Sequence, residues 1–170
     1  GGSSFVSSTL GSSTTYTAGY SSASGNGSLE ITYTDATNPT LSSSTPADNA
    51  TDVALDANIV LNFDESVDVE TGNITIKKTS DNSIFETISV TSSNVTGTGT
   101  TQITVNPSSD FDYGTEYYVL IDTTAFDDSS SNSYAGISST TALSFTTLDP
   151  TTDKDVVGSI DVQSQLAKSS

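Results

Sequence analysis

The sequence contains no cysteine, histidine, tryptophan or methionine among its 170 residues. Without cysteine it can form no disulfide, no thiolate metal site and no cysteine nucleophile. Because histidine is absent as well, a site that pairs a nucleophile with a general base has few possible members. No tryptophan is available as a platform on which a sugar ring could stack. We therefore predict no enzyme activity and name no catalytic residue.

Positive charge is nearly as scarce as these residue types. Four lysines and no arginine stand against 21 acidic residues, which gives a formal net charge of -17. Such a chain repels DNA, RNA and anionic lipid, because these partners are held through Lys and Arg contacts to phosphate. No apolar run approaches the roughly 20 residues of a membrane span. We predict neither nucleic-acid binding nor direct membrane insertion, and we expect the surface to attract cations.

The central part of the chain has the spacing of an all-β protein. Short runs of alternating apolar residues, such as Ile59-Val-Leu61-Asn-Phe63, are separated by clusters of Gly, Pro, Asn, Asp and Ser. This arrangement is typical of a β-sandwich or barrel, in which each strand has one buried face. The predicted strands are 41–45, 58–63, 72–77, 83–90, 100–105, 115–121 and 141–147.

The two ends of the chain differ from this pattern. Residues 1–37 contain Ser/Thr/Tyr runs and too few apolar residues for a core, so we predict an incomplete β element or the tail of a preceding module. Residues 149–170 are predicted to form a linker or a short helical tail. The opening Gly1-Gly2-Ser3-Ser4 lacks the charged and apolar regions of a signal peptide. We therefore expect the sequence to be a segment of a longer protein.

Four segments of the central region carry a resemblance to a known family. They are Pro46 to Val53, Phe63 to Val67, Thr115-Glu-Tyr117-Tyr-Val119 and Leu143-Ser-Phe145-Thr-Thr147. In this order they resemble the P-x-x-G-A-x-x-V, F-S-E-x-V, T-x-Y-x-V and W/F-S-F-T-T elements of the bacterial Ig-like domain family. The sequence departs from the family pattern at Asn49 and Ser131, where Gly is frequent, and at Asp64, where Ser is frequent.

The resemblance implies an Ig-like antiparallel β-sandwich of about seven strands over residues 38–148. Members of the family are repeated in large secreted and cell-surface bacterial proteins, so it implies an extracellular location and a structural or adhesive role. The expected partners are neighbouring modules of the same chain or like subunits. A sandwich also often places a buried tyrosine at the position of Tyr117, with its hydroxyl bonded to nearby backbone as a tyrosine corner.

Strand direction predicts that acidic residues gather at the two ends of the sandwich. Strands in Ig order alternate in direction, so the second-to-third and sixth-to-seventh connections lie where the first strand begins. The acidic residues expected at this N-terminal pole are Asp35, Asp64, Glu65, Asp68, Glu70, Asp122, Asp127 and Asp128. Those expected at the opposite, C-terminal pole are Asp48, Asp52, Asp56, Asp81, Asp110, Asp112, Asp149 and Asp153. In an array of such modules, acidic poles would face each other at every joint.

A hard cation would remove this repulsion. Calcium takes 6–8 oxygen ligands, at about 2.3–2.6 Å, from carboxylates, amides and carbonyl groups. We predict a Ca²⁺ site at the N-terminal pole that fixes the linker and stiffens the array. Its candidate ligands are Asp35, Asp64, Glu65, Asp68, Asp127, Asp128 and Asn132. The alternative is a solvated acidic surface, because the sequence lacks the D-x-D-x-D-G spacing of an EF-hand.

Two other functions are open at this point. The module could bind a carbohydrate or a surface protein through a loop pole or through Tyr16, Tyr20 and Tyr33, since tyrosine suits interfaces. It could also be a self-assembling filament or surface-layer subunit, if its N-terminal strands complete the sheet of a neighbouring chain.

Overall fold

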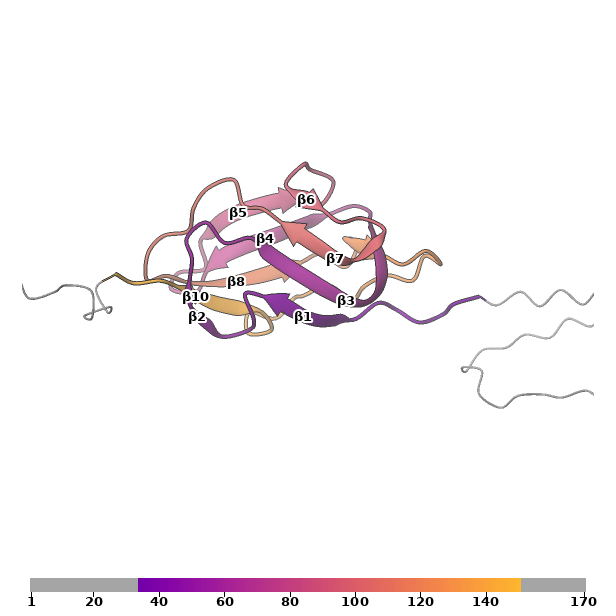
Figure 1. The fold of residues 1–170 in the computed structure, drawn as a ribbon, viewed down its shortest axis with the longest axis horizontal. Coiled ribbons are helices and arrows are strands. Elements are labelled where there is room, and N and C mark those ends of the chain that lie inside the picture. The colour runs from indigo at the N-terminus through magenta and orange to yellow at the C-terminus, as the bar shows by residue number, and fades with distance from the viewer. Residues whose placement is uncertain (1–33, 151–170) are drawn as a thin grey trace, which may run out of the picture.

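Two β-sheets pack face to face in the computed structural model, which describes residues 34–150 (Figure 1). The sandwich has ten strands: β1 (Leu41–Thr45), β2 (Ala50–Val53), β3 (Ile59–Val69), β4 (Asn73–Lys78), β5 (Ile84–Ser89), β6 (Val95–Thr96), β7 (Thr100–Val105), β8 (Glu116–Ile121), β9 (Phe126–Asp127) and β10 (Ser144–Thr147). No helix long and apolar enough to cross a membrane occurs within residues 34–150. The two packed sheets confirm the predicted all-β sandwich.

The two sheets divide the strands between them. One sheet has the order β1-β3-β7-β6, and β9 joins it by pairing with the end of β3; the other has the order β2-β10-β8-β4-β5. Neighbouring strands are antiparallel except for β2 and β10, which are parallel. The chain thus contributes its first strand to one sheet and its second strand to the other, where that strand lies beside the last one.

The predicted strands are all present, and three short ones join them. β1 and β7 have the predicted bounds, whereas β2, β6 and β9 were not predicted. The largest difference concerns the acidic stretch after Phe63, which was predicted to be a loop. That prediction is wrong, because β3 continues through Val69 and pairs with β9. Its pairing with β7 is irregular between Asn62 and Val67 and resumes where Val67 pairs with Thr100, so the strand bends here without ending.

The core lies between the sheets and contains two groups of aromatic rings. Phe63, Phe126 and Tyr134 pack near the end of β3, with the Phe63 and Phe126 ring centroids 5.5 Å apart in an edge-on contact. A second group surrounds Tyr117 and Phe145, whose centroids are 5.8 Å apart. Both groups are buried, and edge-on or offset contacts of this kind stabilise a core beyond the area they bury.

Tyr117 forms the predicted tyrosine corner. Its ring is fully buried, and its hydroxyl accepts a hydrogen bond of 3.0 Å from the backbone N–H of Asp112. The pKa of this hydroxyl is raised, mainly because burial disfavours its ionised form. The bond ties the connection between β7 and β8 to the start of β8.

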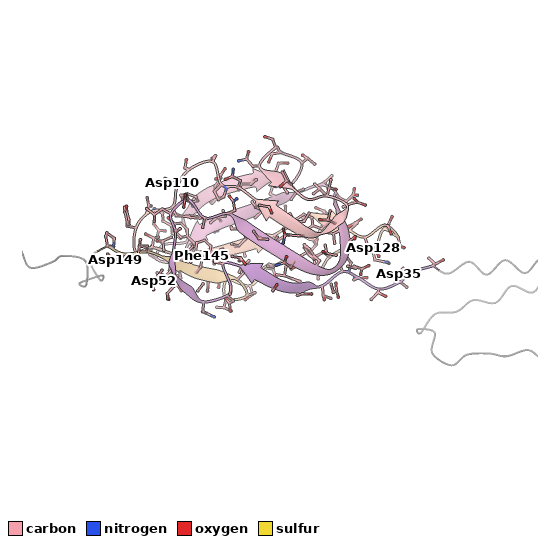
Figure 2. The ribbon with its side chains drawn as sticks, viewed as in Figure 1. Asp35, Asp52, Asp110, Asp128, Phe145 and Asp149 are labelled. Carbon is pink, nitrogen blue, oxygen red and sulfur yellow. The ribbon has the colours of Figure 1, made fainter. Side chains whose placement is uncertain are left out.

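The two ends of the described chain lie at opposite poles of the sandwich. The chain enters at the end where β1 begins and leaves at the end where β10 stops (Figure 1). Asp35 and Asp128 lie at the N-terminal pole, whereas Asp52, Asp110 and Asp149 lie at the C-terminal pole (Figure 2). This agrees with the arrangement expected from strand direction; Asp153, Tyr16, Tyr20 and Tyr33 lie outside the described residues.

Candidate functional site

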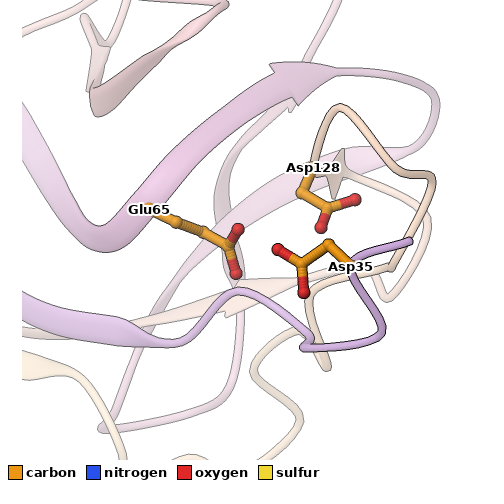
Figure 3. Close-up of side chains that lie close together, drawn as sticks. All are labelled: Asp35, Glu65 and Asp128. Atoms are coloured by element: carbon orange, nitrogen blue, oxygen red, sulfur yellow. The ribbon is translucent and has the colours of Figure 1, made fainter. Parts of the chain in front are cut away.

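A group of three carboxylates forms at the N-terminal pole from three distant parts of the chain. Asp35 comes from the segment before β1, Glu65 from β3 and Asp128 from the turn after β9 (Figure 3). One carboxylate oxygen from each residue lies within 4.8 Å of the others. Two oxygens on opposite sides of one Ca²⁺, each about 2.4 Å from the ion, are about 4.8 Å apart. The spacing of the three carboxylates is therefore compatible with a shared ion. We call these residues the acidic triad.

The register of β3 directs Glu65 toward this group. Phe63 and Val67 are buried residues of the strand, and Glu65 stands midway between them on the same alternating face. Glu65 lies within the irregular stretch of the β3–β7 pairing, between Asn62 and Val67, where the regular ladder is interrupted. A charged side chain can therefore occupy an inward position here while it remains partly exposed.

Asp128 organises the turn that follows β9. Its side chain is 6% exposed, and its Oδ1 accepts backbone N–H bonds from Ser130 and Asn132 at 2.8 and 2.7 Å. The amide of Asn132 donates to Asp128 Oδ2 at 2.7 Å. Burial raises the pKa of Asp128, but these three hydrogen bonds lower it by more, so the net shift is downward. Asp128 is therefore held in its ionised form.

The same asparagine fastens the incoming chain. Asn132 Nδ2 donates to the backbone carbonyl of Asp35 at 3.2 Å, while the Asp35 carboxylate accepts from Thr37 N and Oγ1 at 2.9 and 2.8 Å. The segment between residues 34 and 40 has no regular secondary structure. These contacts nevertheless hold Asp35 against the turn after β9.

Within the acidic triad, Glu65 is the residue whose ionised form is disfavoured. Its pKa is raised, first because burial removes it from water, and then because Asp128, Asp35 and Asp64 repel its charge. No lysine lies within the triad, and the ion pair found in residues 34–150 is at the other pole. Within residues 34–150 no positively charged side chain forms an ion pair with the triad, and a bound cation would balance its negative charge.

The structure places the remaining predicted ligands differently. Asp64 points to the start of β1, where its two oxygens accept from Thr40 N and Oγ1 at 2.7 Å each. The bonds from Thr40 also lower its pKa. Asp68 and Asp127 face each other across β3 and β9, and Asp68 accepts a bond from Thr98 at 3.2 Å.

Of the seven predicted ligands, the structure therefore groups Asp35, Glu65 and Asp128, with Asn132 bonded to two of them. Thr40 and Thr98 were not predicted to take part. They come from segments that reach the pole only through strand pairing, and a lone threonine carries no local signal for such a contact.

Two of the three departures from the family pattern, Asn49 and Ser131, occupy backbone positions that suit glycine. Asn49 has a φ of 59° and Ser131 a φ of 66°. Glycine adopts such angles without strain, and asparagine does so more readily than other residues. The Asn49 substitution therefore preserves the turn geometry, whereas Ser131 is under backbone strain.

We expect Ser131→Gly to stabilise the protein. Glycine removes the strain of the left-handed conformation, which stabilises the folded state by about 1–2 kcal/mol. Glycine also makes the unfolded chain more flexible, which lowers the free energy of unfolding by about 0.4–1 kcal/mol. Urea unfolding should show a net gain of roughly 0.5 kcal/mol. Ser130→Gly is the matched control, because Ser130 is not among the residues with positive φ and glycine there should lower stability. An equal loss in both variants would contradict the strain at Ser131.

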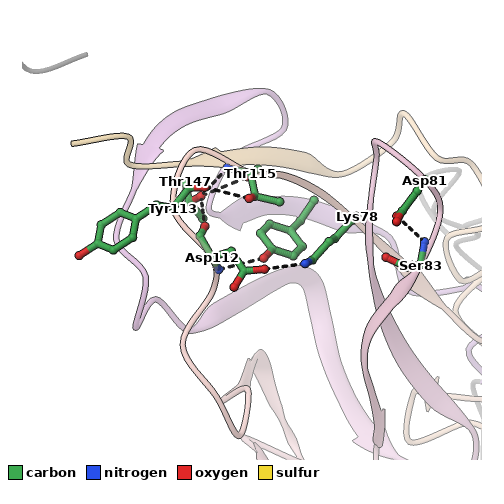
Figure 4. A network of polar contacts seen from close by, with 8 residues as sticks. Lys78, Asp81, Ser83, Asp112, Tyr113, Thr115 and Thr147 are labelled. Atoms are coloured by element: carbon green, nitrogen blue, oxygen red, sulfur yellow. Dashed lines mark hydrogen bonds and ion pairs between the residues drawn. The ribbon is translucent and has the colours of Figure 1, made fainter. Parts of the chain in front are cut away.

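The C-terminal pole has a different character. Lys78 Nζ lies 2.5 Å from Asp112 Oδ2, and the hydrogen bond to Asp112 raises the pKa of the lysine (Figure 4). Thr147, at the end of β10, donates to the backbone carbonyl of Asp112 at 2.6 Å. Tyr113 extends away from this network and is 59% exposed. The side chains here hold the β7–β8 connection against β10, and the described residues of this pole form no group of three carboxylates like that of the other pole.

Comparison with known proteins agrees with this architecture. The profile of a family described as bacterial Ig-like domain matches residues 35–147. No curated protein matches the chain. The match spans most of the sandwich, from the acidic triad's Asp35 to the last residue of β10. The chain therefore belongs to the bacterial Ig-like domain family.

Proposed function

We propose that this module is a structural spacer of a larger bacterial surface or secreted protein, with no catalytic role of its own. The observation that carries the proposal is the position of the two chain ends at opposite poles (Figure 1). Modules joined in this way extend in a line and hold other domains away from an anchoring point. Their partners would be neighbouring modules or like subunits, and their place would be outside the cell.

The acidic triad supports a more specific proposal, in which Ca²⁺ fixes the joint before the module. Asp35 belongs to the incoming segment, whereas Glu65 and Asp128 belong to the sandwich. An ion shared by the three would join linker to domain, with amide or carbonyl groups and water as its other ligands. The linker is already placed by the bond from Asn132 to the Asp35 carbonyl. Calcium would then restrict its remaining motion.

We expect Ca²⁺ to raise the melting temperature relative to EGTA, and Mg²⁺ to have a smaller effect. A ligand present at 100 times its dissociation constant stabilises the folded state by about 2.7 kcal/mol, which moves the midpoint by several degrees. Magnesium separates coordination from screening, because its smaller shell demands stricter geometry. Equal shifts with both ions would mean that the acidic residues form only a screened surface.

The variant Glu65→Gln tests the site itself. Because the folded-state pKa of Glu65 is raised, the folded protein binds its proton more tightly than the unfolded chain does, and stability is lost as the pH rises through that pKa. At neutral pH the variant should therefore melt higher than the wild type in EGTA and respond less to Ca²⁺. Glu70→Gln, an exposed change just beyond the end of β3, should leave the response unchanged. A full Ca²⁺ response in Glu65→Gln would contradict the site.

A further inference from the structure

The positions of the chain ends determine how tension would act on this module. Force applied through neighbouring modules would enter before β1 and leave after β10, along the long axis of the sandwich (Figure 1). The strands run between these poles. Tension would therefore act along the strands and across the hydrogen bonds that join them, because those bonds lie across the strand direction.

The parallel pair of β2 and β10 lies directly between the two points of force. β2 follows β1 near the start of the sandwich, and β10 is its last strand. Tension would pull β2 toward the N-terminal pole and β10 toward the C-terminal pole. Two parallel strands drawn in opposite directions slide past each other, so their hydrogen bonds must break together. If the strands were peeled apart from one end, the bonds would break one after another.

Polar contacts reinforce both ends of this pair. At the start of β2, Asn49 N donates to Ser144 O at 2.8 Å, and Asp48 Oδ1 accepts from Ser144 N at 2.9 Å. Beyond the far end, Leu148 N donates to Val53 O at 2.9 Å. Ser144 is only 6% exposed, so water has little access to the bonds it makes. The turn before β2 is thereby attached to the first residue of β10.

A further contact secures the chain before this pair is reached. Thr40, just ahead of β1, donates two hydrogen bonds to the carboxylate of Asp64 on β3. β1 itself is antiparallel to β3 and would also slide along it under tension. Force would thus pass from the Thr40–Asp64 contact, through β1, to the pair of β2 and β10.

We propose that the module is a load-bearing link, in which the parallel β2–β10 pair is the element that resists tension between the two poles. The proposal rests on the proposed spacer function, but it does not depend on calcium. It assigns a role to Asp48, which is not a member of the acidic triad and anchors β10 through Ser144. The partner that this function requires is a pulling attachment at each end of the chain.

Single-molecule force spectroscopy on the full chain can test the proposal. Because the sequence has no cysteine, pairs of introduced cysteines define the points of attachment without ambiguity. Asn38→Cys with Pro150→Cys applies force between the poles. Ser42→Cys with Thr87→Cys applies it between exposed residues of the edge strands β1 and β5, across the strands. All measurements are made in EGTA, so a failure here is distinct from a failure of the calcium proposal.

We expect a severalfold higher unfolding force between the poles than across the strands. Asp48→Ala should lower the force between the poles and leave the transverse force unchanged. Asp81→Ala is the matched control, because Asp81 accepts a backbone bond from Ser83 in the β4–β5 turn, outside the β2–β10 pair (Figure 4). Equal unfolding forces in the two pulling geometries would overturn the proposal. This comparison uses the protein with Asp48 intact, so it does not depend on whether Asp48→Ala folds. An equal loss in both geometries for Asp48→Ala would overturn the role of Asp48.

Discussion

Phe126→Ala is expected to lower the free energy of unfolding by about 3–5 kcal/mol, the usual loss for a buried phenylalanine. Phe126 is fully buried, and its ring packs edge-on against Phe63 with centroids 5.5 Å apart. It also belongs to β9, a strand of two residues whose attachment to β3 depends on this packing. Since a domain is stable by about 5–15 kcal/mol in total, the loss would be a large part of the whole.

Urea unfolding would measure this loss, and thermal melting should show a fall of roughly 10–20 °C in the midpoint. Tyr113→Ala is the control, because this aromatic residue is 59% exposed at the other pole and its removal should change stability by no more than about 0.5 kcal/mol. A loss of less than about 1 kcal/mol for Phe126→Ala would show that the cavity collapses. The N-terminal pole would then owe little to its aromatic group.

The parts of the fold that were predicted correctly are those with a complete local pattern. β1 and β7 match their predicted bounds, since each has turn residues on both sides. The two-residue strands β6 and β9 cannot display a period, so their presence depends on partners distant in the chain. The sequence predicts an end of this strand at Phe63, six residues early, because the polar stretch that follows resembles the Asp- and Ser-rich clusters between the other strands. Its alternation in fact continues through Glu65 to Val67.

The sequence predicts at which pole of the sandwich the candidate site lies, but not which side chains form it. Strand direction alone brings Asp35, Glu65 and Asp128 to the same end, as the structure does. It cannot show which side chains converge, because that depends on the bend in β3 and on the turn held by Asp128. Asp64 illustrates the limit. It is adjacent to Glu65 in sequence but points to the opposite face of the strand, where Thr40 binds it.

The other large effect is expected at the turn between β6 and β7. Gly97 has a φ of 106°, and a Cβ at this position would lie 2.0 Å from the backbone oxygen of Gln102. Its carbonyl also accepts bonds from Thr100 N and Oγ1 at 3.1 and 2.8 Å, which close the turn. Gly97→Ala would therefore combine backbone strain with a collision against main chain that cannot rotate away. We expect it to lower the free energy of unfolding by about 3 kcal/mol or more.

Gly99→Ala separates these two contributions, because it lies in the same turn and also has a positive φ, of 77°. The atom that its Cβ would approach is a side-chain oxygen of Asp68, at an ordinary contact distance of 3.6 Å. This variant should lose only the conformational term of about 1–2 kcal/mol. Urea unfolding of both variants, compared at equal m-values, gives the steric term as their difference. If the two losses were equal, the turn would move enough to accept a methyl group at Gly97, and the close approach to Gln102 would not constrain the fold.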